Sequence, residues 1–183
     1  MNLTTYELRS ITLVPVGRAN EQSLGVLKEQ LPEKFPGASC RIKEIDTGFE
    51  ESFNTRTGQY YATKILASLE RHAKHAEGEK LLGVTDLDLY VPNMNFVFGE
   101  ASLPGSVAVI STHRLKDATR YGDAQLFHVR VIKESVHELG HTMGLSHCDK
   151  PSCVMYFSNS LSDTDRKGED FCETCSRKLG RDR

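Results

Sequence analysis

The 183-residue chain contains no tryptophan and no long apolar run. None of its apolar stretches approaches the roughly 18 consecutive residues that a membrane-spanning helix requires. Its first ten residues, MNLTTYELRS, lack the basic segment followed by an apolar segment that marks a secretory signal. These absences predict a cytoplasmic protein without a membrane partner.

The chain also lacks an excess of positive charge. Its 23 Lys and Arg residues face 25 Asp and Glu residues, which gives a formal net charge of −2. No global positive field is therefore present to attract nucleic acid. The basic end, SRKLGRDR, is short and typical of a solvated terminus, so we expect no nucleic-acid partner.

Cysteines are few, and their number is odd. Four of the five lie between Cys148 and Cys175, and Cys40 stands alone. An odd number argues against a complete disulfide framework. In a reducing compartment such a cluster favours metal binding over disulfides.

Apolar periodicity predicts an α/β (α+β) fold, a mixed sheet of about five strands with helices packed against it. One helix is expected before Pro36, a second from Tyr61 to near Gly78, and a third from about Asp123 into the sequence HELGHTMGLSHC. The predicted strands cover residues 11–17, 40–45, 81–91, 95–101 and 106–112.

The composition changes after Gly144, where the chain becomes polar and rich in Ser, Asp, Lys and Cys. We therefore predict a single domain of residues 1–183, monomeric, with an N-terminal part (1–144) and a small C-terminal part (145–183). A bound metal would help to hold such a tail in place.

The stretch HELGHTMGLSHC holds three of the seven histidines. His137 and His141 are four residues apart, so on a helix both imidazoles lie on one face and can reach one ion. Gly144 can adopt a left-handed conformation that ends the helix and turns the chain. That turn could bring His147 to the same ion, whereas a continued helix would carry it to another face.

Three neutral histidines leave a fourth zinc position open, which is typical of a catalytic site. Zinc lowers the pKa of a bound water to about 7. Glu138, rotated by roughly 100° from His137, can contact that water without being a ligand. The pattern thus predicts hydrolysis of a peptide bond with Glu138 as the general base.

The sequence resembles the archaemetzincin family of zinc peptidases in the metzincin clan. The resemblance rests on HExxHxxGxxH, a cysteine directly after the third histidine, and a tail with Cys148, Cys153, Met155, Cys172 and Cys175. It is close in the final third of the chain, and over residues 1 to about 125 it extends only to the order of elements.

The resemblance implies a metzincin-like twisted sheet with two helices, an active-site helix and a small zinc-stabilised C-terminal subdomain. It implies a catalytic zinc on His137, His141 and His147, and a second, structural zinc on the four clustered cysteines. Met155 would form an apolar floor beneath the histidines. Some metzincin families place a tyrosine near the metal, but this chain has Phe157 there, so no fourth protein ligand is expected.

Four thiolates in two closely spaced pairs suit a tetrahedral zinc site. The neighbouring side chains of His147 and Cys148 diverge, so they can serve two adjacent ions more easily than one. Two disulfides or free thiols are the alternative. The remaining candidates are interpreted as surface polar groups or, for Cys40, as a buried thiol: His72, His75, His113, Asp86, Asp88 and Cys40. His128 is nine residues before His137, which on one helix is half a revolution, so we expect it to face away from the metal site.

Pro92 and Pro104 flank a segment that suits an edge strand, because proline lacks the N–H that a central strand needs. Metzincins align substrates along such a strand, so the resemblance predicts a peptide or protein substrate bound at Phe96 to Ala101. A zinc-stabilised peptide-binding module with little or no proteolytic activity is the first alternative, although it has no need of Glu138. A nucleic-acid-binding zinc module built on the cysteine tail is the second, and the net charge counts against it.

Overall fold

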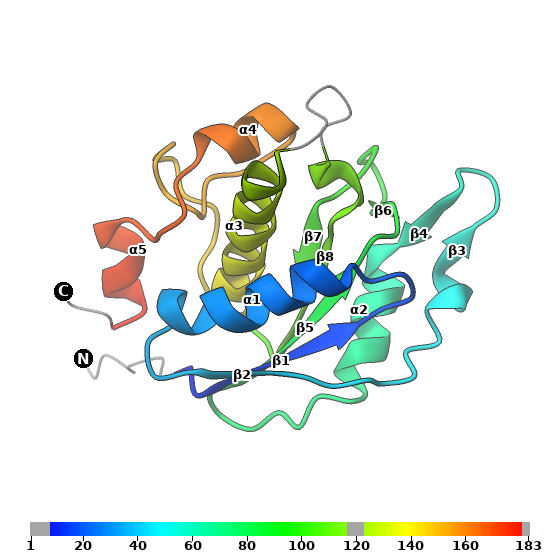
Figure 1. The fold of residues 1–183 in the computed structure, drawn as a ribbon, viewed down its shortest axis with the longest axis horizontal. Coiled ribbons are helices and arrows are strands. Elements are labelled where there is room, and N and C mark those ends of the chain that lie inside the picture. The colour runs from blue at the N-terminus through cyan, green and yellow to red at the C-terminus, as the bar shows by residue number, and fades with distance from the viewer. Residues whose placement is uncertain (1–7, 117–122, 181–183) are drawn as a thin grey trace.

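A computed structural model describes residues 8–116 and 123–180 of the chain. Its main sheet has the strand order β2-β1-β5-β8-β7 (Figure 1). All neighbouring strands are parallel except β7, which pairs antiparallel with β8 at the edge. The strands are β1 (Ser10–Pro15), β2 (Ser39–Ile42), β5 (Glu79–Thr85), β7 (Gly99–Ala101) and β8 (Val107–Ser111). This confirms the prediction of a mixed sheet of about five strands.

Three helices cover the two faces of this sheet. Helices α1 (Glu21–Lys34) and α3 (Ala124–Thr142) lie together on one face, and α2 (Ala62–Glu70) lies on the other (Figure 1). The first face buries a large core that includes Leu27 of α1 and Val136 of α3. Since both faces are covered, the apolar strands are buried on both sides.

Side-chain caps set the starts of the two helices on the shared face. The Asn20 side chain accepts a hydrogen bond from the Ser23 amide at 2.9 Å, and the Asp123 side chain accepts one from the Leu126 amide at 2.9 Å. Such caps satisfy amides that have no partner within the helix. The third helix thus begins close to the residue that the periodicity predicted.

The prediction of one continuous strand over residues 81–91 is wrong. It divides into β5 and β6 (Leu89–Tyr90), and β6 joins a second, three-stranded sheet with β3 (Phe53–Asn54) and β4 (Gln59–Tyr61). Two short 3-10 helices also occur, at Phe49–Ser52 and His113–Leu115.

The interpretation of Asp86 and Asp88 as an exposed strand face was also wrong. They lie between β5 and β6, are half-buried, and form ion pairs of 2.6 Å with Lys116 and Arg114, respectively. Cys40 is likewise half-buried rather than fully buried.

The second helix ends at Glu70 rather than near Gly78. His72 and His75 therefore follow the helix instead of lying on it, and both are exposed. His113, in the second 3-10 helix, is exposed as well, whereas His128 on α3 is half-buried.

The tail was expected to be irregular, yet it contains α4 (Leu161–Arg166) and α5 (Glu173–Lys178). Buried side chains such as Met155, Phe171 and Leu179 join the same core as α1 and α3. The division of the domain after Gly144 stays a prediction. The tail is therefore packed onto α3, and it can position groups around that helix.

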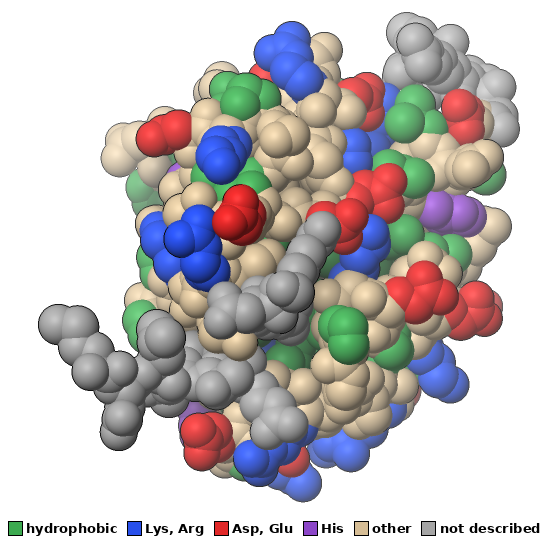
Figure 2. All heavy atoms as spheres, turned by 90° about the vertical axis from the view of Figure 1, so that its left-hand side faces the viewer, with side chains coloured by type: hydrophobic (Ala, Val, Ile, Leu, Met, Phe, Trp, Pro, Cys, Tyr) green, Lys and Arg blue, Asp and Glu red, His purple; other side chains and the backbone are tan. Residues whose placement is uncertain are grey.

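Acidic and basic side chains are interspersed on the face of the molecule presented in Figure 2. Across the described parts of the chain, the structure contains no helix that is both long and apolar enough to cross a membrane.

Candidate active site

Helix α3 ends in a sharp turn at Gly144, whose φ is +90°. The Gly144 amide donates to the His141 carbonyl at 2.9 Å, and the Leu145 amide donates to the Gly140 carbonyl at 3.1 Å. These two bonds are the Schellman pattern, in which glycine adopts the left-handed conformation at low cost. The chain then reverses, as the sequence predicted.

The turn brings three histidines together. The ring centroids of His137, His141 and His147 lie 4.7 to 5.3 Å from one another. One ring nitrogen from each lies within 4.8 Å of the other two, a spacing suited to one metal ion. His137 is buried and His147 is exposed, so the cluster has one open side.

Backbone carbonyls orient two of these rings. Nδ1 of His137 lies 2.8 Å from the Val154 oxygen, and Nδ1 of His141 lies 2.6 Å from the Leu145 oxygen. A hydrogen bond to each carbonyl needs the hydrogen on Nδ1, and that tautomer leaves Nε2 with a free lone pair. The two Nε2 atoms are 3.1 Å apart. Two lone pairs this close repel unless a cation lies between them, so this donor set fits a metal ion.

The surroundings keep the histidines neutral. Burial, together with the positive charge of Lys167, holds the pKa of His137 well below its ordinary value. Burial also lowers the pKa of His141 and of His147. Neutral imidazole is the form that binds a metal.

Glu138 lies against the edge strand β7. A methyl group added at Gly99 would lie 2.7 Å from both Cγ and Oε1 of Glu138, so the strand backbone touches this carboxyl directly. Burial, with the nearby charge of Glu134, raises the pKa of Glu138 well above its ordinary value. Gly99 was not singled out in the sequence, although a glycine within a strand can signal such a close approach.

A cleft of about 480 Å³ contains this site. The three histidines and Glu138 line it together with strand β7, and its rim includes the exposed side chains of Leu103 and Phe157. The ring of Phe157 lies 4.9 Å from that of His147. The cleft thus brings the histidines, an acid and an edge strand to one opening.

Only part of the predicted substrate-binding segment Phe96–Ala101 is free to pair with a peptide. The Val97 amide already donates to the Leu89 carbonyl, and the Phe98 carbonyl accepts from the Ser111 amide. Since hydrogen-bonded positions alternate along an antiparallel pair, and Ser102 bonds Val107, Gly99 and Ala101 point their N–H and C=O groups away from β8.

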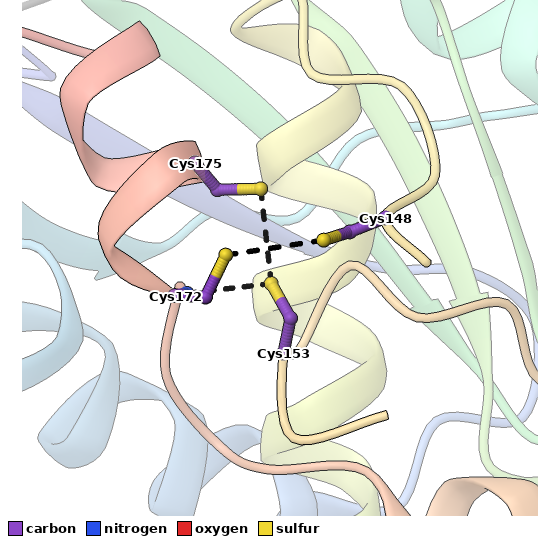
Figure 3. Close-up of side chains that lie close together, drawn as sticks. All are labelled: Cys148, Cys153, Cys172 and Cys175. Atoms are coloured by element: carbon purple, nitrogen blue, oxygen red, sulfur yellow. Dashed lines mark hydrogen bonds between the residues drawn. The ribbon is translucent and has the colours of Figure 1, made fainter. Parts of the chain in front are cut away.

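The four clustered cysteines form a second group. Their sulfur atoms all lie within 4.8 Å of one another, and none is in a disulfide. Figure 3 shows Cys172 and Cys175 approaching from the α5 segment and Cys148 and Cys153 from the loops after α3. The sulfur atoms of Cys148 and Cys172, and those of Cys153 and Cys175, are each 3.8 Å apart, too long for an S–S bond of about 2.05 Å.

Met155 is fully buried next to α3. A methyl group added at Gly140 would collide with its sulfur atom and would lie 3.1 Å from the Phe171 ring. Gly140 thus lets the helix pack closely against Met155 and the tail.

Two ion pairs that the sequence analysis missed, one of them fully buried, connect the tail to α3. Lys167, with no exposed side-chain area, lies 3.1 Å from Glu134, which also accepts a 2.7 Å hydrogen bond from Thr164. Arg130 binds both carboxylate oxygens of Asp165 at 2.6 and 2.7 Å. Glu134 precedes His137 by three residues, so helical spacing places both on one face. That spacing could have indicated from the sequence that Glu134 lies near the histidines.

Comparison with known proteins agrees with this geometry. The sequence model of peptidase family M54 matches residues 21–181. The archaemetzincin of Methanocaldococcus jannaschii is 40% identical over 173 residues, which is 92% of each chain. That of Pyrococcus furiosus is 38% identical over 176 residues, covering 92% of this chain and 91% of the relative.

Solved structures give the same result. The archaemetzincin of Archaeoglobus fulgidus, complexed with malonate, superimposes with a TM-score of 0.80 at 40% identity, covering 92% of this chain and 99% of the other. A zinc-dependent peptidase from Methanocorpusculum labreanum gives 0.81 at 33% identity with the same coverage. The chain therefore belongs to peptidase family M54, the archaemetzincins, and is a metallopeptidase.

Proposed function

We propose that this protein hydrolyses peptide bonds with one zinc ion held by His137, His141 and His147, and with Glu138 as the general base. The observation that carries the proposal is the convergence of three neutral imidazoles, two of them oriented by backbone carbonyls, and one carboxyl in a cleft along a free strand edge. A zinc ion bound there would polarise the scissile carbonyl and lower the pKa of a water molecule.

The chain's own groups supply proton transfer. Glu138 accepts a proton from the attacking water as its oxygen adds to the carbonyl carbon. The same carboxyl then gives that proton to the amine nitrogen as the C–N bond breaks. Its contact with Gly99 restricts where the carboxyl can lie.

We propose that the peptide substrate lies along β7 as an added strand. The outward-facing amides and carbonyls of Gly99 and Ala101 would pair with its backbone. Because Gly99 also touches Glu138, this pairing brings a substrate peptide bond close to the base.

A second, structural zinc on the four cysteines completes the proposal, giving two zinc ions per chain. The four sulfur atoms converge without forming disulfides, which suits a closed tetrahedral thiolate site. We expect a monomer that binds neither nucleic acid nor a membrane and acts in the cytoplasm.

A zinc-stabilised module that binds peptides without cleaving them is the alternative. The placement of Glu138 against the edge strand favours the enzyme, because a purely structural site needs no acid there. The deciding experiment incubates zinc-loaded protein with a diverse peptide mixture and identifies new termini by mass spectrometry. New termini that disappear with Glu138→Gln support the enzyme. An unchanged mixture, or cleavage that persists in Glu138→Gln, contradicts it.

A further inference from the structure

Among the residues that the structure describes, three carboxyl side chains line the cleft: Glu100, Glu134 and Glu138. Glu134 has a cationic partner, because Lys167 lies 3.1 Å away in a fully buried ion pair. Glu138 lies beside the histidines and has the role of proton carrier. The third carboxyl, that of Glu100, has no role in the metal site or in the packing of the fold that would account for its place in the cleft.

Glu100 is half-buried on β7, and both of its carboxylate oxygens accept from the Thr63 hydroxyl, at 2.8 and 3.0 Å. No Lys, Arg or His within residues 8–116 and 123–180 forms an ion pair with it. A partly desolvated carboxylate that has only a neutral hydroxyl as partner is incompletely compensated. Consistent with that, burial raises the pKa of Glu100, although the Thr63 hydrogen bond opposes the shift.

The position of Glu100 on the strand places it beside the substrate. It lies between Gly99 and Ala101, the two residues whose backbone groups face the open edge. Successive side chains on a strand point to opposite faces. A peptide added along β7 would therefore place one side chain next to that of Glu100, with a Cβ–Cβ separation of about 5 Å.

Apolar side chains line the same cleft as Glu100 and Thr63, among them Val91, Met94 and Val97. An aliphatic stem that ends in a positive charge matches this combination, because it can bury its methylene groups while its charged end meets a carboxylate. Lysine and arginine have this form.

We propose that Glu100 is a specificity-determining residue that accepts a cationic group of the substrate, namely a lysine or arginine side chain near the scissile bond. The proposal rests on the peptidase function proposed above and refines its substrate class. A free amino terminus carries the same positive charge, and the experiment separates the two sources.

The test uses one peptide series that contains Lys or Arg near the cleavage site, or their neutral counterparts norleucine and citrulline, each with a free or an acetylated amino terminus. The wild type is expected to cleave the cationic peptides with a kcat/KM about tenfold or more above the neutral ones, since a hydrogen bond to a charged group is worth this much. Glu100→Gln, which can keep the Thr63 contact, should remove the preference. Glu33→Gln, an exposed change of equal charge on α1, should retain it.

Two results would overturn the proposal: a wild type that cleaves both kinds of peptide equally well, or a preference that survives Glu100→Gln. The wild type could instead prefer peptides with a free amino terminus over acetylated ones, and lose that preference with Glu100→Gln. The amino terminus would then be the cation, and this result would still support recognition of a positive charge by Glu100.

Measuring the affinity for peptides tests cation recognition by Glu100 independently of peptide-bond hydrolysis. Calorimetry should show that zinc-loaded Glu138→Gln protein binds the cationic peptides more tightly than the neutral ones. Adding Glu100→Gln should abolish this difference in affinity. If binding shows this pattern while the wild type cleaves nothing, the hydrolytic function fails and cation recognition stands. If the wild type cleaves peptides but neither assay depends on Glu100, only the present proposal fails.

Discussion

Replacing Gly99 with alanine tests whether the edge strand positions the general base. The new methyl group would lie 2.7 Å from Cγ and Oε1 of Glu138 and 2.7 Å from the carbonyl oxygen of Val109. Favourable contacts between carbon atoms begin at about 3.5 Å. The Glu138 side chain must therefore move, by roughly 0.8 Å to restore such a contact. The Val109 oxygen belongs to the backbone of β8, so β7 must also shift locally to relieve that second contact.

This displacement sets the expected size of the effect. A misplacement of about 1 Å in a catalytic group can cost about 10²-fold in rate. Overpacking of this kind costs about 1–3 kcal/mol of stability. We therefore expect Gly99→Ala to lower kcat about 100-fold and to reduce the melting temperature by several degrees, with little change in zinc content because no histidine is moved.

Steady-state peptide hydrolysis, zinc analysis and thermal unfolding measure the three quantities separately. Gly25→Ala is the matched control, since a methyl group there has no neighbour within 4 Å and Gly25 lies within α1. That change should leave activity intact and stabilise the helix by about 0.5–1 kcal/mol. Normal kcat in Gly99→Ala would refute the claim that β7 positions Glu138.

Other substitutions test the remaining parts of the site. Glu138→Gln should retain all bound zinc yet lose about 10²–10⁴ in hydrolysis rate, whereas His141→Ala should lose one zinc ion. Loss of zinc from Glu138→Gln would show that Glu138 is a metal ligand rather than the general base. Metal analysis during mild chelation should show two zinc ions per chain and one leaving first, because three imidazoles with an open position hold zinc less tightly than four thiolates. Lys167→Met should destabilise the fold by about 3–5 kcal/mol by leaving Glu134 as an unpaired buried charge, and adding Glu134→Gln should recover much of this in thermal unfolding. If the double variant recovered none of the lost stability, the Lys167–Glu134 ion pair would not explain the effect of Lys167→Met.

Much of the site could be predicted because its residues are close in sequence. The four-residue interval from His137 to His141 fixes a common helical face, and Gly144 alone explains how His147 returns to it. The central strands β1, β5 and β8 of the main sheet were also predictable, since they contain short apolar runs.

Contacts between distant segments were not predictable in the same way. The contact between Gly99 and Glu138 depends on how β7 packs against α3, and no local pattern reports that distance. Asp86 and Asp88, which lie between β5 and β6, pair with residues 30 and 26 positions further along the chain, and no local pattern reports such contacts. The two-residue strands β3 and β6 are too short to show any periodicity.

The adjacency of His147 and Cys148 links the two candidate metal sites through one short segment. The Cys148 amide donates to the Met155 carbonyl at 2.9 Å, and the preceding carbonyl, of Val154, lies 2.8 Å from Nδ1 of His137. Cys153, directly before Val154, belongs to the cysteine cluster. Metal on the cysteines would therefore fix the carbonyl that orients a histidine of the other cluster.

Cys175→Ala tests this link, because it changes only the cysteine cluster and leaves every histidine in place. It should lower the melting temperature, since a structural zinc contributes folding energy. It should also weaken zinc binding at the histidines about 10–100-fold, the usual cost of losing a partner that orients a metal ligand. Competition with a chelator measures that affinity directly. An unchanged histidine-site affinity, in protein that has lost the cysteine-bound zinc, would show that Val154 keeps its position without it and that the two sites are independent.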